Sequence, residues 1–236
     1  MTGPPEAGAP LARLMRHHGL DPGGVEGGSA APEPAALRRL APALGLHPGD
    51  VFVIAGVPLP EDLAPLDDRA GRRFPRIVGC ALVLPAQRRS GLGDLVRSLP
   101  RQERTRPVPA PRPYERYPPG APGGLILRLL GRRNLSWVGA AQTLYRLSDL
   151  CLAASTIGAV GRGRKELTPE LVRGFAAVLG IPVVDLAVLT GVGPPSGVTP
   201  PDGAVADAAA LLAELYRLTD DQARQVEETA ESLSRG

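Results

Sequence analysis

The chain is poor in aromatic residues, cysteine and lysine. Only 3% of its 236 residues are Phe, Trp or Tyr, too few for an aromatic-rich β-sandwich or for a surface that stacks single-stranded bases. Two cysteines, Cys80 and Cys151, give no disulfide framework and indicate a reduced, intracellular protein. No apolar run reaches the roughly 18 residues of a membrane span, and the N-terminus does not resemble a signal peptide. We therefore expect a cytoplasmic protein that does not enter a membrane.

Positive charge is concentrated in two segments. The chain has 27 Lys and Arg against 24 Asp and Glu, a net charge of +3. Residues 67–117 contain 12 Arg and 5 acidic residues, and residues 123–192 contain 8 basic and 4 acidic residues. The segments 1–66 and 204–236 are net acidic. This distribution permits a polyanionic partner but does not require one.

An internal repeat is the most informative pattern. The segment ALRRLAPALGLHPGDVFVIAGVPLP (36–60) aligns with LVRGFAAVLGIPVVDLAVLTGVGPP (171–195) at a constant offset of 135 residues. The identical pairs include Arg38/Arg173, Ala41/Ala176, Leu44/Leu179, Gly45/Gly180, Asp50/Asp185, Val53/Val188, Gly56/Gly191 and Val57/Val192. A further match, of 84–99 with 218–233, has an offset of 134.

The first helix of each repeat shows that one copy is shorter. Residues 11–20 match 126–135 at an offset of only 115, so the first repeat lacks about twenty residues after that helix. The second repeat fills this space with residues 136–167, whereas the first has only a Gly/Pro-rich loop that cannot hold two helices. We predict four parts: a degenerate helix-turn-helix-like repeat with trailing helices at 1–106, a Pro/Gly-rich linker at 107–124, a helix-turn-helix domain at 125–192, and C-terminal helices at 193–236. The trailing helices either pack on their own repeat or form a dimer seam.

Helix signals occur throughout the chain and predict an all-α fold. Thr168-Pro169-Glu170 supplies an N-cap, an N1 proline and an early acid, and Gly180 ends that helix. The segment from Thr219 to Gln222 reads as a capping box. Only VGCALVL (78–84) is ambiguous between helix and strand.

The second repeat resembles the Xre family of lambda-repressor-like helix-turn-helix domains. STIGAVGRGR (155–164) and LTPELVRGFAAVLGIPVVDL (167–186) carry the resemblance, together with the core spacing of Ala141 and Leu144. The resemblance implies that residues 155–164 contain the recognition helix. It covers residues 123–192 well and residues 10–60 in degenerate form.

The resemblance also implies which residues contact DNA. Ser155 and Thr156 would lie at base edges, although helix capping is an equal alternative for these two hydroxyls. Arg162, Arg164 and Lys165 would meet the phosphate backbone, and Arg128, Arg132 and Arg133 the flanking backbone. Trp137 stands where the family usually has a DNA-contacting Gln, and Gly158 and Ala159 offer no side-chain donors. Direct readout should therefore be sparse.

Other residue types point to structural roles. We interpret Cys151 as a buried small hydrophobe and Trp137 as a core or interface anchor. The histidines have no metal-ligand spacing, and no catalytic constellation is present, so we expect neither a cofactor nor an enzyme. The sequence favours a nucleoid-associated transcriptional regulator that binds double-stranded DNA specifically, as a homodimer. The alternative is a protein-interaction adaptor that has lost specific DNA binding.

Overall fold

The chain is all-helical in the part that the computed structural model describes, residues 8–23, 32–104, 116–118, 120–197 and 200–235. Those residues form twelve α-helices and one short 3-10 helix, and no strand. The helices are α1 (Ala9–His17), α2 (Pro34–Ala43), α3 (Pro48–Ala55), η1 (Ala70–Arg72), α4 (Phe74–Val83), α5 (Ala86–Ser98), α6 (Pro122–Arg132), α7 (Trp137–Ser148), α8 (Ala154–Gly161), α9 (Pro169–Leu179), α10 (Val183–Thr190), α11 (Gly203–Leu215) and α12 (Asp220–Arg235). The predicted all-α fold is confirmed.

The helix ends follow from the local sequence. Thr168 Oγ1 accepts a hydrogen bond from the Leu171 amide at the start of α9 (3.4 Å), and Gly180 ends α9 with a φ of 63°. The predicted capping box before α12 is present, because the Gln222 amide donates to Thr219 Oγ1 (3.2 Å) and the Thr219 amide donates to Gln222 Oε1 (3.1 Å). The ambiguous run at 78–84 lies in α4 and just after it.

One predicted boundary is wrong by three residues. The linker was expected to extend to residue 124, but α6 begins at Pro122. A proline fits the first turn of a helix because the amide it lacks would have no partner there. Of the other predicted linker residues, 116–118 and 120–121 are described and lie outside any helix, and 107–115 and 119 lie outside the described residues.

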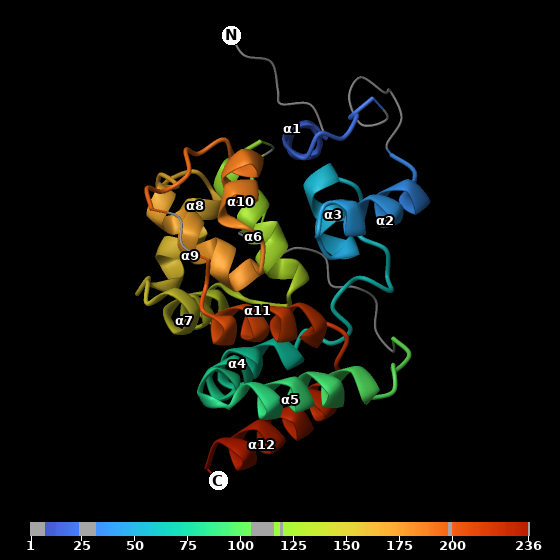
Figure 1. The fold of residues 1–236 in the computed structure, drawn as a ribbon, viewed down its shortest axis with the longest axis vertical. Helices are drawn as coiled ribbons and strands as arrows, with labels where there is room; N and C mark the ends of the chain where they lie inside the picture. Colours follow the sequence, from blue (N-terminus) through green and yellow to red (C-terminus); the bar gives the residue numbers. More distant parts are fainter. Residues whose placement is uncertain (1–7, 24–31, 105–115, 119, 198–199, 236) are drawn as a thin grey trace.

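The helices form three groups that share one hydrophobic core. Figure 1 shows α1–α3 on one side, α6–α10 on the other, and α4, α5, α11 and α12 below both. Buried apolar side chains from all three groups belong to a single continuous cluster. Within the described residues, the two predicted repeats therefore do not have separate cores.

The two halves pack against each other in a reciprocal way that is consistent with the predicted repeat. The bounds of α2 and α3 correspond to those of α9 and α10 at the offset of 135 residues. The helix α1 packs against α10, and its counterpart α6 packs against α3. Similarly, α5 packs against α11 and α12 against α4. Each of these contacts occurs twice with the roles exchanged, as expected for an approximate two-fold axis between the halves. The described residues between α1 and α2, 18–23 and 32–33, contain no counterpart of α7 or α8.

The basic segment 67–117 is partly neutralised by the acidic C-terminal helices. The ion pairs are Arg72–Asp220, Arg73–Asp220, Arg73–Glu227, Arg76–Glu231 and Arg89–Asp207. These pairs join the trailing helices of one repeat to those of the other. Four of the twelve arginines of this segment are therefore paired with acidic residues of the C-terminal helices.

The helices α6 and α8 touch through glycine. A Cβ at Gly123 would overlap the carbonyl oxygen of Val160, and a Cβ at Gly161 would lie 2.7 Å from Leu127 Cγ. At Gly123 the two backbones therefore approach so closely that no side chain fits between them, and at Gly161 the side chain of Leu127 takes the space that a Cβ would need. These contacts fix the position of α8 on α6.

Replacing Gly123 with Ala should destabilise the protein by about 1–3 kcal/mol, because the new methyl group must displace backbone. The matched control is Gly131→Ala in the same helix. Gly131 is exposed and its Cβ would meet nothing within 4 Å, so the control should be neutral or stabilising by up to about 1 kcal/mol. Urea unfolding followed by circular dichroism measures both. Equal stability of the two variants would show that the α6–α8 approach is looser in solution.

Candidate nucleic-acid interface

The residues predicted to contact DNA lie on α8, in the turn that follows it, and at the C-terminal end of α6; α7 precedes α8 and positions it. Ser136 caps α7, since its Oγ accepts a hydrogen bond from the Gly139 amide at 3.2 Å. Asp149 ends α7 in the left-handed conformation with a φ of 58°, and α8 begins five residues later at Ala154. In Figure 1, α8 lies on the side of the molecule away from α1–α3. The helix α8 is therefore presented at an outer edge and not between the two halves.

Ser155 and Thr156 lie in the first turn of α8 and are not its caps. The residue at the N-cap is Ala153, which has no side-chain oxygen to accept a hydrogen bond. Ser155 is exposed and Thr156 is half-buried. Neither hydroxyl hydrogen-bonds to any residue that the structure describes, so capping does not account for them.

Trp137 covers the middle of α8. A Cβ at Gly158 would lie 2.5 Å from the Trp137 ring, so the indole rests on the bare backbone of this residue. The Arg162 guanidinium lies over the indole, 4.9 Å from its centroid, and Trp137 Nε1 donates a hydrogen bond to Tyr117 Oη at 2.9 Å. Trp137 is half-buried against the core, as predicted for an anchor. Arg162 is thus engaged with the indole, where a direct phosphate contact had been expected.

Three cations surround the C-terminal end of α8. Arg164 and Lys165 are exposed, and their amides donate to the carbonyl of Ala159, which folds the turn back onto α8. Arg128 on α6 lies near the same end of the helix: a Cβ built at Gly124 would be 3.5 Å from Arg128 Nη1 and 3.4 Å from the Gly161 carbonyl oxygen. None of the three cations forms an ion pair with a described residue. The C-terminal end of α8, with the turn after it and the neighbouring part of α6, therefore offers positive charge that no described ion pair compensates.

Arg132 and Arg133 do not belong to this surface, and the expectation that they reach the DNA backbone needs correction. Only 2% of Arg132 and 1% of Arg133 is exposed. Both bind the buried carboxylate of Asp50, Arg132 through Nε at 2.8 Å and Arg133 through Nη1 at 2.9 Å and Nη2 at 3.0 Å. These two arginines lie at the end of α6 that faces the first half of the chain. They therefore join the halves instead of contacting a ligand outside.

Electrostatics in this ion cluster favour the ionised carboxylate. Burial would raise the pKa of Asp50, but Arg133 and Arg132 outweigh that effect and hold it below the ordinary value. His47 lies beside the cluster at the start of α3, where its Nδ1 accepts a hydrogen bond from the Gly49 amide at 3.0 Å. Burial, assisted by the charge of Arg132, lowers the pKa of His47 from 6.5 to about 4. The imidazole is consequently neutral near pH 7.

The corresponding aspartate in the second half has histidine partners. Asp185 stands 135 residues after Asp50, and its Oδ1 accepts a hydrogen bond from His18 Nε2 at 3.0 Å. His17 Nε2 lies 3.7 Å from the same oxygen. At the offset of 115, His17 and His18 correspond to Arg132 and Arg133. Sequence reasoning missed both ion contacts. The aligned aspartates and the aligned basic pairs were the signal that could have found them.

One further expectation is wrong, because Cys151 is exposed and not a buried hydrophobe. It lies in the connection between α7 and α8, where its apolar neighbours in sequence do not form a helical face. No group of three His, Cys, Asp or Glu side chains in the described ranges could hold a metal ion.

Comparison with known proteins found no relative. No protein-family model matches the chain, and no curated protein or solved structure is significantly similar to it. As for membranes, no single helix among the described residues is long and apolar enough to cross one; α9 and α10 pass this test only as a pair that bends by 120°.

The lowered pKa of His47 predicts a pH-dependent stability. Above pH 6.5 the imidazole is neutral in both states, whereas between about pH 6.5 and 4 only the unfolded chain takes up its proton. Stability should therefore fall as the pH drops through this window, by on the order of 1–3 kcal/mol given the partial exposure of the ring.

The matched variant is His47→Asn, which keeps an N-cap acceptor but cannot titrate. Urea unfolding at a series of pH values should show wild type losing stability relative to the variant between pH 6.5 and 4. A difference that stays constant over this range would contradict the buried neutral imidazole.

Proposed function

We propose that the protein binds duplex DNA through α8 and the turn after it, and acts as a transcriptional regulator. The observation that carries this proposal is the uncompensated charge of Arg128, Arg164 and Lys165 at one end of α8, with Ser155 exposed at the other end. A major groove about 12 Å wide admits a helix, whose first turn meets base edges. Flanking cations then neutralise phosphates.

This geometry favours backbone contact over base readout. Trp137 occupies the surface of α8 at Gly158, so the middle of the helix presents an indole where a polar side chain would read a base. Only the first turn, with Ser155 and Thr156, carries hydroxyl groups free to bond to bases or phosphates. Specificity therefore depends on few direct contacts together with the shape of the DNA.

Each chain contributes one reading helix, because the described part of the first half contains no counterpart of α8. The first half serves as a packing partner for the second through α1, α3, α4 and α5. Recognition of two inverted half-sites would then need a homodimer of whole chains, which we retain as part of the proposal.

The second candidate function is a protein-interaction adaptor, and one observation favours it. Val138 and Tyr145 lie two turns apart on α7 and are 56% and 55% exposed. Large apolar side chains at this spacing on one helix face suit a protein partner better than a phosphate backbone. The two candidate functions differ in one measurable property: the regulator should prefer particular duplex sequences, whereas the adaptor should not.

Replacing Arg164 and Lys165 together with Ala should weaken binding to every duplex. Each lost phosphate contact lowers the slope of log K against log salt by roughly 0.9, so the slope should fall by about 1.8. The control is Arg39→Ala with Arg69→Ala, two exposed arginines of the first half that form no ion pair with a described residue. Fluorescence anisotropy at several salt concentrations measures the slopes. If the slope changes equally in both double variants, Arg164 and Lys165 do not lie at the DNA interface.

Replacing Ser155 and Thr156 together with Ala separates regulator from adaptor. Lost base contacts should cost about 1–3 kcal/mol at particular base pairs and leave non-specific affinity nearly unchanged. Since neither hydroxyl caps a helix, the free energy of unfolding should change little. The measurement compares a duplex selected from random sequences with its scrambled form at one fixed salt concentration. If the variant keeps its full preference for the selected duplex, the bases are read by residues other than Ser155 and Thr156. If the wild type shows no preference for any duplex, the adaptor is favoured.

A further inference from the structure

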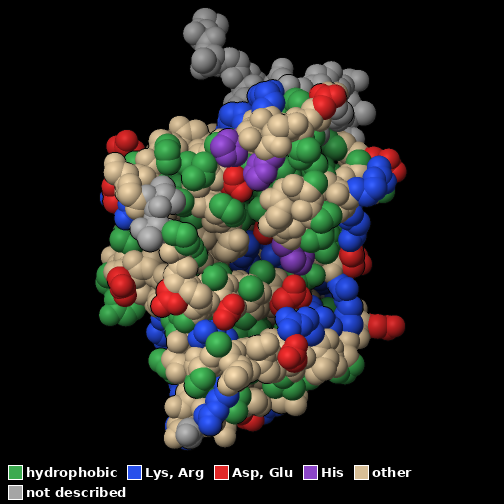
Figure 2. Space-filling view, viewed as in Figure 1, with side chains coloured by type: hydrophobic (Ala, Val, Ile, Leu, Met, Phe, Trp, Pro, Cys, Tyr) green, Lys and Arg blue, Asp and Glu red, His purple; other side chains and the backbone are tan. Residues whose placement is uncertain are grey.

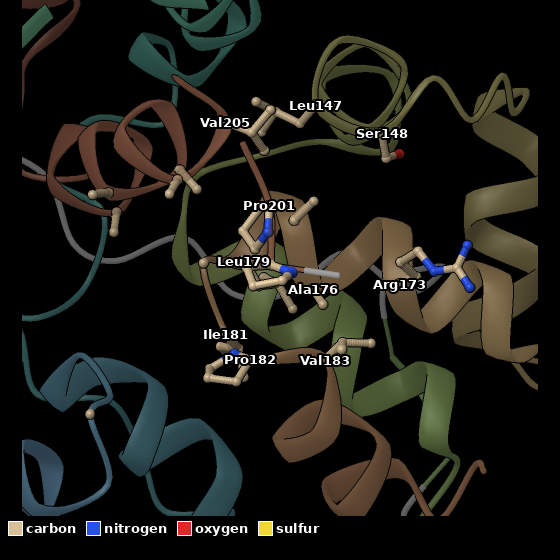
Figure 3. A pocket seen from close by; sticks show the side chains of 18 of the residues that line it. Leu147, Ser148, Arg173, Ala176, Leu179, Ile181, Pro182, Val183, Pro201 and Val205 are labelled. Atoms are coloured by element: carbon tan, nitrogen blue, oxygen red, sulfur yellow. The ribbon is translucent and has the colours of Figure 1, made fainter. Parts of the chain in front are cut away.

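A cavity of about 700 Å³ lies between the two halves of the chain. Its walls come from α9, the connection to α10, α11 and the segment before α3, and Figure 3 shows Leu179, Ile181, Val183 and Val205 around it. Ala176, Ala177, Ala206, Ala209, Ala210 and Ala213 line much of the remaining surface. Small side chains on α9 and α11 thus leave an apolar space large enough for a small organic molecule.

The polar part of the wall is the ion cluster of Asp50. Arg133, Asp50 and His47 all line the cavity. Figure 2 shows basic and histidine side chains in a hollow in the middle of this face. Arg132 and Arg133 bring two positive charges to a single carboxylate, and the neutral His47 adds none. The cluster therefore carries one surplus positive charge. That charge lies behind the wall, because Arg132 does not itself line the cavity and its guanidinium lies over the Tyr216 ring, 5.1 Å from the ring centroid.

The cluster also has donors without acceptors. Arg133 Nε is buried and has no hydrogen-bond partner among the described residues, and the same holds for both terminal nitrogens of Arg132. Buried guanidinium donors that lack an acceptor are costly. The equivalent Asp185 is held by two partly exposed histidines and has no such buried donors beside it among the described residues.

We propose that the cavity binds a small amphipathic anion, a single carboxylate attached to an apolar chain. The carboxylate compensates the surplus charge of the Asp50 cluster, and the chain lies along the alanine-lined walls of α9 and α11. The remaining charged wall residues, Arg173 and Asp202, balance each other, so one negative charge on the ligand suffices. This site is separate from the α8 surface, and its test does not depend on DNA binding.

The experiment is isothermal titration of the full chain with decanoate. Decyltrimethylammonium serves as the probe with the same tail and opposite charge, and acetate as the head group alone. We expect saturable 1:1 binding of decanoate, with at least tenfold weaker binding of both other probes. Absence of saturable decanoate binding up to millimolar concentration overturns the proposal. Binding of decyltrimethylammonium as tight as that of decanoate also overturns the proposal, because the cavity would then bind the apolar tail without regard to the charge of the head group.

Variants test the location. Ala213→Phe fills the cavity from α11 and should weaken decanoate binding at least tenfold, whereas Ala86→Phe, at an exposed position on α5 away from the cavity, should leave it unchanged. Arg132→Met removes the surplus charge but leaves the Asp50–Arg133 pair intact, and should weaken decanoate at least tenfold. Thermal unfolding checks that each variant is folded. If Arg132→Met does not fold, the binding of the three probes to the wild type and to Ala213→Phe tests the proposal. Unchanged binding in folded Ala213→Phe overturns the location.

Discussion

The buried carboxylate of Asp50 is the interaction on which the joining of the two halves depends. It fixes the end of α6 through Arg132 and Arg133, and Arg133 also donates to the carbonyl of Leu179 at the end of α9. Three helices from both halves therefore meet at one ion cluster. Loss of one partner from a buried ion pair leaves an uncompensated charge and costs about 3–5 kcal/mol, a large fraction of the 5–15 kcal/mol by which domains are stable. The position of α8 follows in turn, because α8 packs on α6.

Packing occupies most of α8, and the recognition that we propose would use the remainder. The missing side chain at Gly158 allows Trp137 to cover the helix, and the missing side chain at Gly161 allows α6 to approach. A helix of eight residues that gives its middle and its end to such contacts keeps only its first turn for other partners. The charges that remain unpaired therefore lie in the following turn, at Arg164 and Lys165. A protein built in this way gains affinity for a polyanion more readily than it gains sequence specificity.

The sequence predicted the helices well and the buried charges poorly. Caps at Thr168 and Thr219 and the offsets between repeats depend on local patterns, which the structure follows closely. Arg132 and Arg133 were expected at the flanking DNA backbone because the resemblance to the Xre family placed them on the first helix of that domain. Their burial depends on Asp50, more than 80 residues away, and no local pattern reports such a partner. The exposure of Cys151 was missed for a related reason: apolar neighbours in sequence indicate burial only where a helix gathers them on one face.

The two aspartates that correspond in sequence illustrate how similar positions take different chemistry. Asp50 is fully enclosed, and an enclosed carboxylate stays ionised only beside permanent charges, which arginine supplies. Asp185 meets His17 and His18 at an edge where both rings are partly exposed, so water can share in solvating the carboxylate. The charge of an imidazole depends on its protonation, whereas that of a guanidinium does not. One junction between the halves therefore has a fixed positive charge from arginine, whereas the other is formed with histidine. The surplus positive charge accumulates at the arginine junction, behind the wall of the alanine-lined cavity.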